Sequence, residues 1–225
     1  MMKKIGIIAA ALTVALTTVP VQAKVTADEA AKLGTELTPL GGEKAGNADG
    51  SIPAWTGGIT SAPAGYSAGD FHPDPYAGEK PEFVITAANY QQYADQLSEG
   101  LKKMFETYPD TFKLPVYKTH RSASNPQFVY DATKENATRA TLLDDGNGMA
   151  GAAVGIPFPI PANGLEAIWN HIARYRGPAV QRNGGQAAVT AGGDYNVIGF
   201  DEQLLIQYSQ ENATPESLLE NNVLF

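Results

Sequence analysis

Prolines occupy every second position in the most hydrophobic stretch of this sequence, GIPFPIPANG at residues 155–164. Proline has no backbone N–H, so each one removes a hydrogen-bond donor that a neighbouring strand would need. In an extended chain the three prolines share one face, and the apolar residues between them share the other: Ile156, Phe158 and Ile160. Such a strand pairs along one side only, which makes it a protected sheet edge. The alternative is a polyproline-like connector that packs on the next helix, and the sequence leaves both open.

The segment that follows these prolines is predicted to be an amphipathic helix. Asn163 is the expected N-cap, and Glu166 stands three residues further on. Four apolar side chains recur at helical spacing and predict one apolar stripe: Leu165, Ile168, Trp169 and Ile172. Arg174 and Arg176 lie at the C-terminal end, where the helix dipole favours cations, and Gly177 ends the helix.

The rest of the chain is typical of short helices and strands. Helices are expected at residues 26–33, 86–97, 98–108, 128–139 and from 214 onwards. Strand-like runs occur at residues 111–117, 186–191, 195–200 and 203–208. Gly192-Gly193-Asp194 is the expected turn of a hairpin.

Residues 39–82 are predicted to form a long irregular segment, called the strap below. The run from Pro39 to Pro81 holds six of the fifteen prolines and nine of the 23 glycines, a composition that excludes regular structure. It also carries large apolar residues at intervals, which disordered chains lack: Ile52, Trp55, Tyr66, Phe71 and Tyr76. We therefore expect an ordered strap that lies over the domain surface.

The N-terminus predicts export. Two lysines precede an uncharged apolar run from Ile5 to Val19, and Val21-Gln22-Ala23 supplies the small residues that signal peptidase recognises. A membrane anchor needs about 20 apolar residues, and this run is shorter. Residues 1–23 are thus a predicted signal peptide, cleaved after Ala23, and residues 24–225 a single periplasmic domain. The apolar ending Val223-Leu224-Phe225 looks like the start of a strand, so we also expect a truncated chain.

The composition argues against several classes of protein. The chain has no cysteine, so an exported fold must be held together by its core alone. Cleavage after Ala23 leaves 14 basic residues against 24 acidic ones, a net charge of −10. Such a charge repels phosphate backbones and anionic membranes, so we expect no nucleic-acid partner.

Four signatures, in this order, resemble the exported bacterial family known as domain of unknown function thirteen twenty-nine: LTPLGGEKAGNADGSIPAWTGG, HPDPYAGEKPEFVITAAN, YPDTFKLPVYKTHRSA and GIPFPIPANGLEAIWNHIARYRG. The resemblance extends to Gly177 and weakens over residues 178–199. The family is grouped with the Lol-type outer-membrane lipoprotein-sorting fold. The resemblance implies an α+β protein with a curved antiparallel β-sheet, an incomplete barrel, which helices cover to close an apolar cavity. Because family members are longer than this chain, it also implies that the sequence is the N-terminal portion of such a domain.

In that fold the proline-bearing strand would line the cavity and the following helix would cover it. The expected ligand contacts are Ile156, Phe158, Ile160, Trp169, Ile172 and Trp55. The expected polar or head-group contacts are His171, Arg174 and Arg176. Each has a plainer interpretation: the tryptophans as core anchors, the arginines as compensation of the helix dipole, and the histidine as a surface residue.

No catalytic or metal-binding set stands out in the sequence. His72, His120 and His171 have no partner at a metal-ligand spacing. There is no Gly-x-Ser-x-Gly elbow, no cysteine nucleophile and no phosphate-binding loop pattern. We therefore expect no metal, no cofactor and no enzymatic activity.

Two functions of different classes follow from these observations. The leading hypothesis is a periplasmic, non-enzymatic binding or carrier module for a lipid-like or other hydrophobic ligand, acting at the outer membrane. The second is a structural or assembly partner of an outer-membrane or export complex, with the strap as its interaction surface. A hydrolase with a dispersed site around His120 or His171 ranks third.

Overall fold

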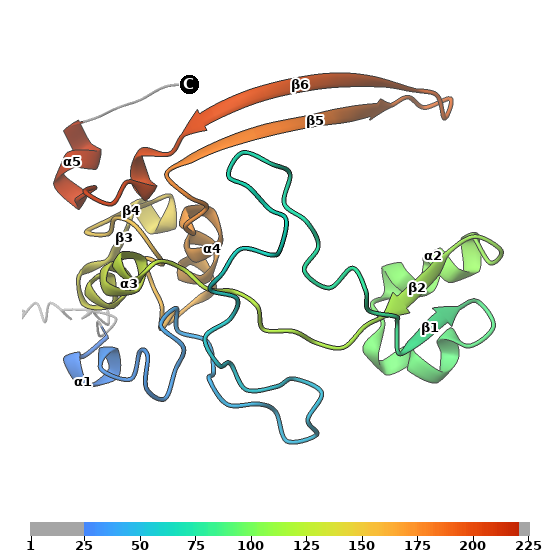
Figure 1. Ribbon diagram of the computed structural model, residues 1–225, viewed down its shortest axis with the longest axis horizontal. Coiled ribbons are helices and arrows are strands. Elements are labelled where there is room, and N and C mark those ends of the chain that lie inside the picture. Colours follow the sequence, from blue (N-terminus) through green and yellow to red (C-terminus); the bar gives the residue numbers. More distant parts are fainter. Residues whose placement is uncertain (1–24, 221–225) are drawn as a thin grey trace, which may run out of the picture.

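The computed structural model describes residues 25–220, arranged as a mixed α+β protein (Figure 1). The predicted signal peptide and the apolar ending at residues 223–225 lie outside the described residues. The helices are α1 (Ala27–Ala30), η1 (Tyr90–Gln96), α2 (Glu99–Thr107), α3 (Gln127–Arg139), η2 (Asp144–Gly146), α4 (Gly164–Ala173), η3 (Gln207–Ser209) and α5 (Pro215–Glu220), with η marking 3-10 helices. The strands are β1 (Phe83–Thr86), β2 (Lys113–Val116), β3 (Thr141–Leu143), β4 (Gly148–Ala150), β5 (Ala179–Val189) and β6 (Tyr195–Leu205).

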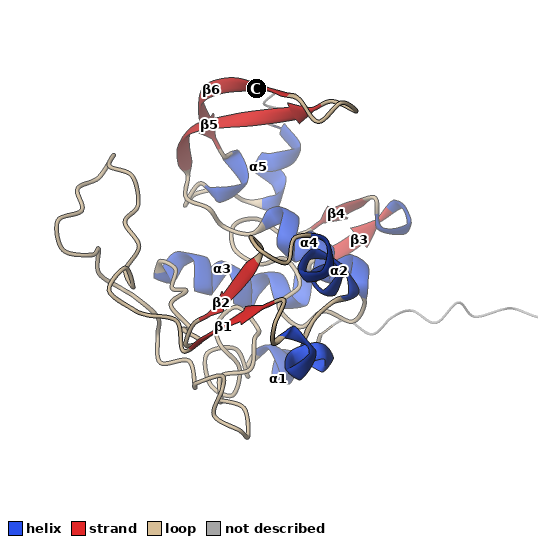
Figure 2. Cartoon of the chain, turned by 90° about the vertical axis from the view of Figure 1, so that its right-hand side faces the viewer, coloured by secondary structure: helices blue, strands red, loops and turns tan. Residues whose placement is uncertain are grey.

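The strands form three separate antiparallel pairs, β1–β2, β3–β4 and β5–β6 (Figure 2). The expected α+β composition is confirmed at this level. The described residues contain no curved or closed sheet, which differs from the incomplete barrel that the resemblance implies. The predicted strand-like runs at 195–200 and 203–208 merge into a single strand, β6, which ends at Leu205, while Gln207 and Tyr208 belong to the 3-10 helix η3. Strand β5 begins earlier than predicted, because Ala179 already pairs with Leu205.

Several predicted local signals set the ends of elements. Thr26 and Glu29 form a capping box at the start of α1, and Ser98 caps α2 through the N–H of Leu101. Asn163 accepts the N–H of Glu166 at the start of α4. These caps are formed between residues three apart in sequence, which is why periodicity and cap chemistry find them.

Residues 83–116 form a module with its own apolar core, which lies apart from the rest of the fold in Figure 1. Phe105 of α2 is fully buried, with Ile85 of β1 and Leu97 beside it. Pro115 sits in β2 opposite Val84, an edge position where its missing N–H costs nothing. The predicted strand at residues 111–117 is confirmed as this two-stranded edge.

The central body packs α3 against the loop that joins β4 to α4. Val129 of α3 is fully buried against Ala153 and Val154. A second cluster lies beside it, where Phe158 and Trp169 pack with Ala140, Ala152 and their neighbours. Helix α1 covers a third cluster, with Ala30 and Leu33 against Ala137 of α3.

The proline-bearing stretch is a buried loop, and the protected-edge strand is wrong. Residues 155–161 pair with no strand, and Pro157 is fully buried. The hydroxyl of Thr133 accepts the N–H of Ile156 at 3.1 Å. The side-chain amide of Asn170 takes both backbone groups of Phe158, at 2.8 Å and 2.7 Å. In this buried connector the prolines remove N–H groups that would otherwise need partners.

The strap, residues 39–82, contains no helix or strand, as predicted. It is attached to residues 120–124, which run beside it. The N–H of Ile59 donates to Ser122, and the indole N–H of Trp55 donates to Ala123 at 3.0 Å. The guanidinium of Arg121 contacts four strap carbonyls, those of Glu43, Lys44, Ala45 and Pro53. One short segment, residues 120–124, therefore holds the strap through contacts with both its backbone and its side chains.

Candidate functional site

Helix α4 presents its apolar stripe to solvent, which sequence periodicity alone does not reveal. Leu165, Ile168 and Ile172 are 50%, 58% and 51% exposed, and no residue of the helix is buried. They lie on one face at positions i, i+3 and i+7. Trp169 lies at the edge of the same face, is half-buried against the Phe158 cluster and donates from its indole N–H to Gly146 at 2.9 Å. These three side chains form a half-exposed apolar surface, called the α4 stripe below, in which Leu165 also lies against Gly146.

The six predicted ligand contacts do not gather in one place. Phe158 and Trp169 share a packed cluster, whereas Ile160 packs on the α1 cluster and Ile172 belongs to the α4 stripe. Ile156 is half-buried. Trp55 lies on the strap and lines a 410 Å³ pocket with Leu33, Pro39, Gln127, Tyr130 and Lys134 among others. Ligand contact by these residues stays a prediction, with Ile172 the one on the exposed stripe.

The predicted head-group residues follow the α4 stripe at the C-terminal end of the helix. Arg174 donates to the carbonyl of His171 at 2.5 Å, and Arg176 reaches the carbonyl of Ile172 at 3.5 Å. Both contacts satisfy carbonyls of the last helical turn, as the dipole interpretation expects. All three side chains are exposed, so the guanidinium groups also stay accessible beside the stripe.

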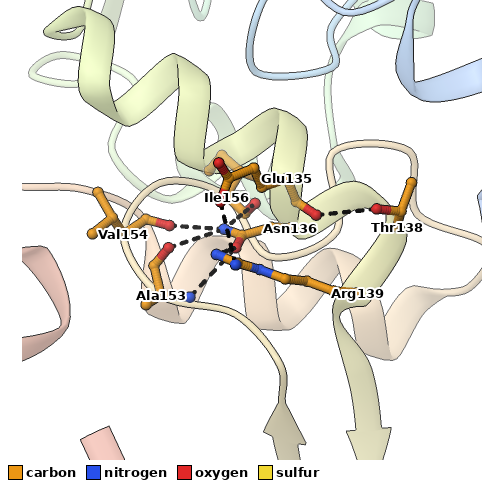
Figure 3. A network of polar contacts seen from close by, with 7 residues as sticks. All are labelled: Glu135, Asn136, Thr138, Arg139, Ala153, Val154 and Ile156. Atoms are coloured by element: carbon orange, nitrogen blue, oxygen red, sulfur yellow. Dashed lines mark hydrogen bonds and ion pairs between the residues drawn. The ribbon is translucent and has the colours of Figure 1, made fainter. Parts of the chain in front are cut away.

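Asn136 of α3 organises the buried loop and was missed by sequence reasoning (Figure 3). Its amide nitrogen is fully enclosed and lies 3.2, 2.9 and 3.2 Å from the carbonyl oxygens of Ala153, Val154 and Ile156. Its carbonyl oxygen accepts from Arg139 at 3.2 Å. In the sequence, Asn136-Ala137-Thr138 matches a glycosylation sequon, an accidental match because the asparagine is buried.

The loop that Asn136 holds is strained. Val154 has φ +54°, a left-handed conformation that β-branched residues rarely adopt. Gly155 follows at φ +60°, where an added Cβ would overlap the Thr133 hydroxyl. The N–H of Val154 donates to the carbonyl of Tyr208, so the loop also ties α3 to the chain beyond the hairpin.

Three buried polar atoms near this loop have no hydrogen-bond partner among residues 25–220: Arg139 Nε, the Tyr208 hydroxyl and Ser209 Oγ. Burial raises the pKa of the Tyr208 hydroxyl far above its usual value of 10, although Arg139 opposes the shift. Of these three residues, Arg139 lines a 330 Å³ pocket, together with Val154 and several acidic residues.

The other two histidines lie on or against the strap. His120 Nε2 lies 2.8 Å from a carboxylate oxygen of Glu79, and its ring stacks on Tyr76 at 3.7 Å. The Tyr76 hydroxyl in turn bonds Ser122 at 2.6 Å. His72 meets Tyr66 edge-on beside a 260 Å³ pocket lined by apolar and proline side chains. Among residues 25–220, no three His, Asp or Glu side chains are grouped to hold a metal ion.

The described part of the chain contains no helix that is both long and apolar enough to span a membrane. The described residues define a class of protein: a mixed α+β protein in which one helix and one hairpin present apolar side chains at the surface. Residues 84–225 match the family described as a protein of unknown function, DUF1329, and the chain belongs to that family. This confirms the resemblance drawn from the four signatures.

The chain is also similar to an uncharacterized protein of Pseudomonas aeruginosa, with 50% identity over 214 residues. The match covers 95% of this chain and 47% of that protein, so the chain spans about half the length of the curated relative it matches. No solved structure matches the chain.

Proposed function

We propose that this protein is a periplasmic, non-enzymatic binding or carrier module for a lipid-like ligand, acting at the outer membrane. The observation that carries the proposal is the α4 stripe, three apolar side chains left half-exposed on one helix face. Scattered exposed apolar residues are ordinary, but a contiguous set on a well-capped helix favours a ligand or a partner.

The chemistry of the α4 stripe fits an amphipathic ligand with an acidic head group. An acyl chain lying along Leu165, Ile168 and Ile172 would place its head near Arg174 and Arg176. Covering a half-exposed Leu or Ile side chain contributes about 1 kcal/mol, so three contribute roughly 3 kcal/mol. Guanidinium groups suit carboxylate and phosphate oxygens because they donate in a planar fork.

The same proposal includes the arrangement of the sheet and of α4. In an incomplete barrel of the Lol type, the hairpin β5–β6 would be one part of the curved sheet, and α4 would close the cavity with its stripe inward. Export by the predicted signal peptide supports the periplasmic location, and the acidic net charge of the mature chain supports a ligand held by local cations.

Native mass spectrometry of the protein purified from cell envelopes tests the proposal. We expect a co-purifying lipid mass that Ile168→Gln reduces several-fold, since the substitution removes about a third of the apolar contact. Ile52→Gln is the matched control, because Ile52 on the strap is 45% exposed and lies outside the α4 stripe. Wild-type protein that never carries a lipid, or equal loss in both variants, would refute the function.

The second candidate is an assembly partner of an outer-membrane or export complex. One observation favours it: Phe71 of the strap is 86% exposed, far more than the other aromatic residues of the strap. Pull-down from envelope extracts separates the two functions. A stoichiometric protein partner that Phe71→Ala abolishes, with no lipid present, supports assembly.

A further inference from the structure

Strands β5 and β6 pair with each other and with no other described strand, and Figure 1 shows the hairpin reaching away from the central body. Hydrogen bonds at its two ends fix which backbone groups point inward. Ile206 donates to Pro178 at the base, and Thr190 donates to Asp194 at the turn. Hydrogen-bonded pairs alternate along an antiparallel ladder. The β6 residues whose N–H and C=O face outward are therefore Tyr195, Val197, Gly199, Asp201, Gln203 and Leu205.

This outward edge of β6 carries two charged residues, Asp201 and Glu202, but no other protection that natural sheet edges use. Strand β6, YNVIGFDEQLL, has no proline and no lysine, and no bulge interrupts its register with β5. Exposed edges of this length are normally protected by prolines or charges, covered or paired, because they otherwise pair with strands of other molecules. The prolines that could have protected a strand edge lie instead in the buried loop at residues 155–161.

The side chains of β6 indicate that the strand belongs inside a larger sheet. Tyr195 and Val197 are each 64% exposed on one face, while Ile198 and Phe200 are 64% and 41% exposed on the other. A strand that is apolar on both faces is typical of the interior of a covered sheet. The neighbouring strand β5 carries only one large exposed apolar residue, Val189, and has Gly184-Gly185 at its centre. The two strands therefore differ in their exposed apolar side chains, and those of β6 favour a further paired strand.

The Pseudomonas relative indicates where a strand that pairs with the open edge of β6 could come from. More than half of the Pseudomonas protein lies outside the match to this chain, so the family contains a large amount of additional polypeptide. We propose that the open edge of β6 accepts a strand from that additional part of the family's polypeptide, which makes β6 an interior strand. This inference concerns how the fold is completed and does not depend on the proposed ligand.

A second copy of this chain fits the edge less well. Antiparallel self-pairing over the whole of β6 sets Glu202 of one copy opposite Ile198 of the other, and Asp201 opposite Gly199. Neither pair is favourable across strands. Each copy also carries a formal charge of −8, so association brings like charges together.

Amide hydrogen exchange on this chain and on the full-length Pseudomonas relative tests the inference without any variant. In this chain we expect the outward amides of Val197, Gly199 and Asp201 to exchange at least tenfold faster than the inward amides of Ile198 and Phe200. In the relative we expect both sets, at the aligned positions, to be equally protected.

A pair of proline variants adds a second readout. Val197→Pro removes an outward N–H of β6, and Ala187→Pro removes the outward N–H of the residue directly opposite it on β5. We expect both to leave the Tm of this chain unchanged, and only the change aligned with Val197 to lower the Tm of the relative, by roughly 5 °C or more. Should Val197→Pro disrupt the hairpin in this chain, the exchange comparison still decides.

Three results would overturn the inference. The first is an outward β6 edge that exchanges fast in the full-length relative. The second is protection or proline sensitivity on the β5 edge in place of the β6 edge. The third is a dimer of this chain in sedimentation equilibrium whose formation protects Val197, Gly199 and Asp201, because the occupant would then be a second copy.

Discussion

Replacing Asn136 should destabilise the protein strongly, and an isosteric replacement should be no better than truncation. The two amide hydrogens of Asn136 serve three buried carbonyls at 2.9–3.2 Å. Losing each net hydrogen bond costs about 1 kcal/mol, and each carbonyl left without a donor costs roughly a further 1–3 kcal/mol. With two donors lost and some solvation regained, Asn136→Ala should lower the free energy of unfolding by roughly 3–4 kcal/mol.

Asn136→Asp tests the cause of this loss. The aspartate keeps the shape of the side chain but turns a carboxylate oxygen toward the three carbonyls, so the effect should be at least as large as that of alanine. Asn196→Asp is the control, because Asn196 is exposed on β6 opposite Ala188 and should change the free energy by less than about 0.5 kcal/mol.

Urea unfolding followed by tryptophan fluorescence measures these differences, and Trp169 reports from the adjoining cluster. With a slope of about 2 kcal/mol per molar urea, the midpoint for Asn136→Ala should fall by roughly 1.5–2 M. An Asn136→Asp variant as stable as the wild type would show that the volume of the side chain, and not its donors, holds the loop.

Three further predictions follow from the same structure. Arg121→Ala should speed proteolysis within the strap by roughly tenfold, whereas Arg176→Ala, which removes one long contact, should not; equal rates would contradict the attachment. Gly155→Ala should lower the free energy of unfolding by at least about 2 kcal/mol in urea, because its Cβ meets Val129 O at 2.8 Å; Gly164→Ala, with open space around it, should be neutral or stabilising. The backbone N–H and the hydroxyl of Thr26 both donate to the Glu29 carboxylate and lower its pKa, so the contribution of Glu29 to stability is complete above the unfolded pKa and is lost as pH falls through the lowered pKa. Thr26→Ala should raise that pKa part of the way to 4.5 in a carbon-13 NMR titration, and an unchanged pKa would refute the capping role.

Features fixed by residues near one another in sequence were predictable. The cap at Asn163 and the glycine turn before Asp194 form as expected, because cap and turn chemistry involves residues within four positions. The irregular strap was predictable as well, since its composition excludes helices and strands.

Features fixed by distant residues were not predictable. Whether residues 155–161 are a strand or a connector depends on Thr133 and Asn170, which take the N–H groups between the prolines. Likewise, periodicity defined the stripe on α4 but could not tell which of its side chains face inward. Trp169 is half-buried against the Phe158 cluster while Ile168 and Ile172 stay exposed, and that division depends on the position of Phe158.

The way in which Arg121 binds the strap affects which residues of the strap can vary among homologues. The guanidinium contacts main-chain oxygens only, so the identities of Glu43, Lys44, Ala45 and Pro53 are not recognised by it. Substitutions at these four positions should therefore be tolerated in a saturation-mutagenesis screen, whereas Arg121 itself should admit almost none. Homologues can in this way diversify the outer surface of the strap while its path across the molecule stays the same.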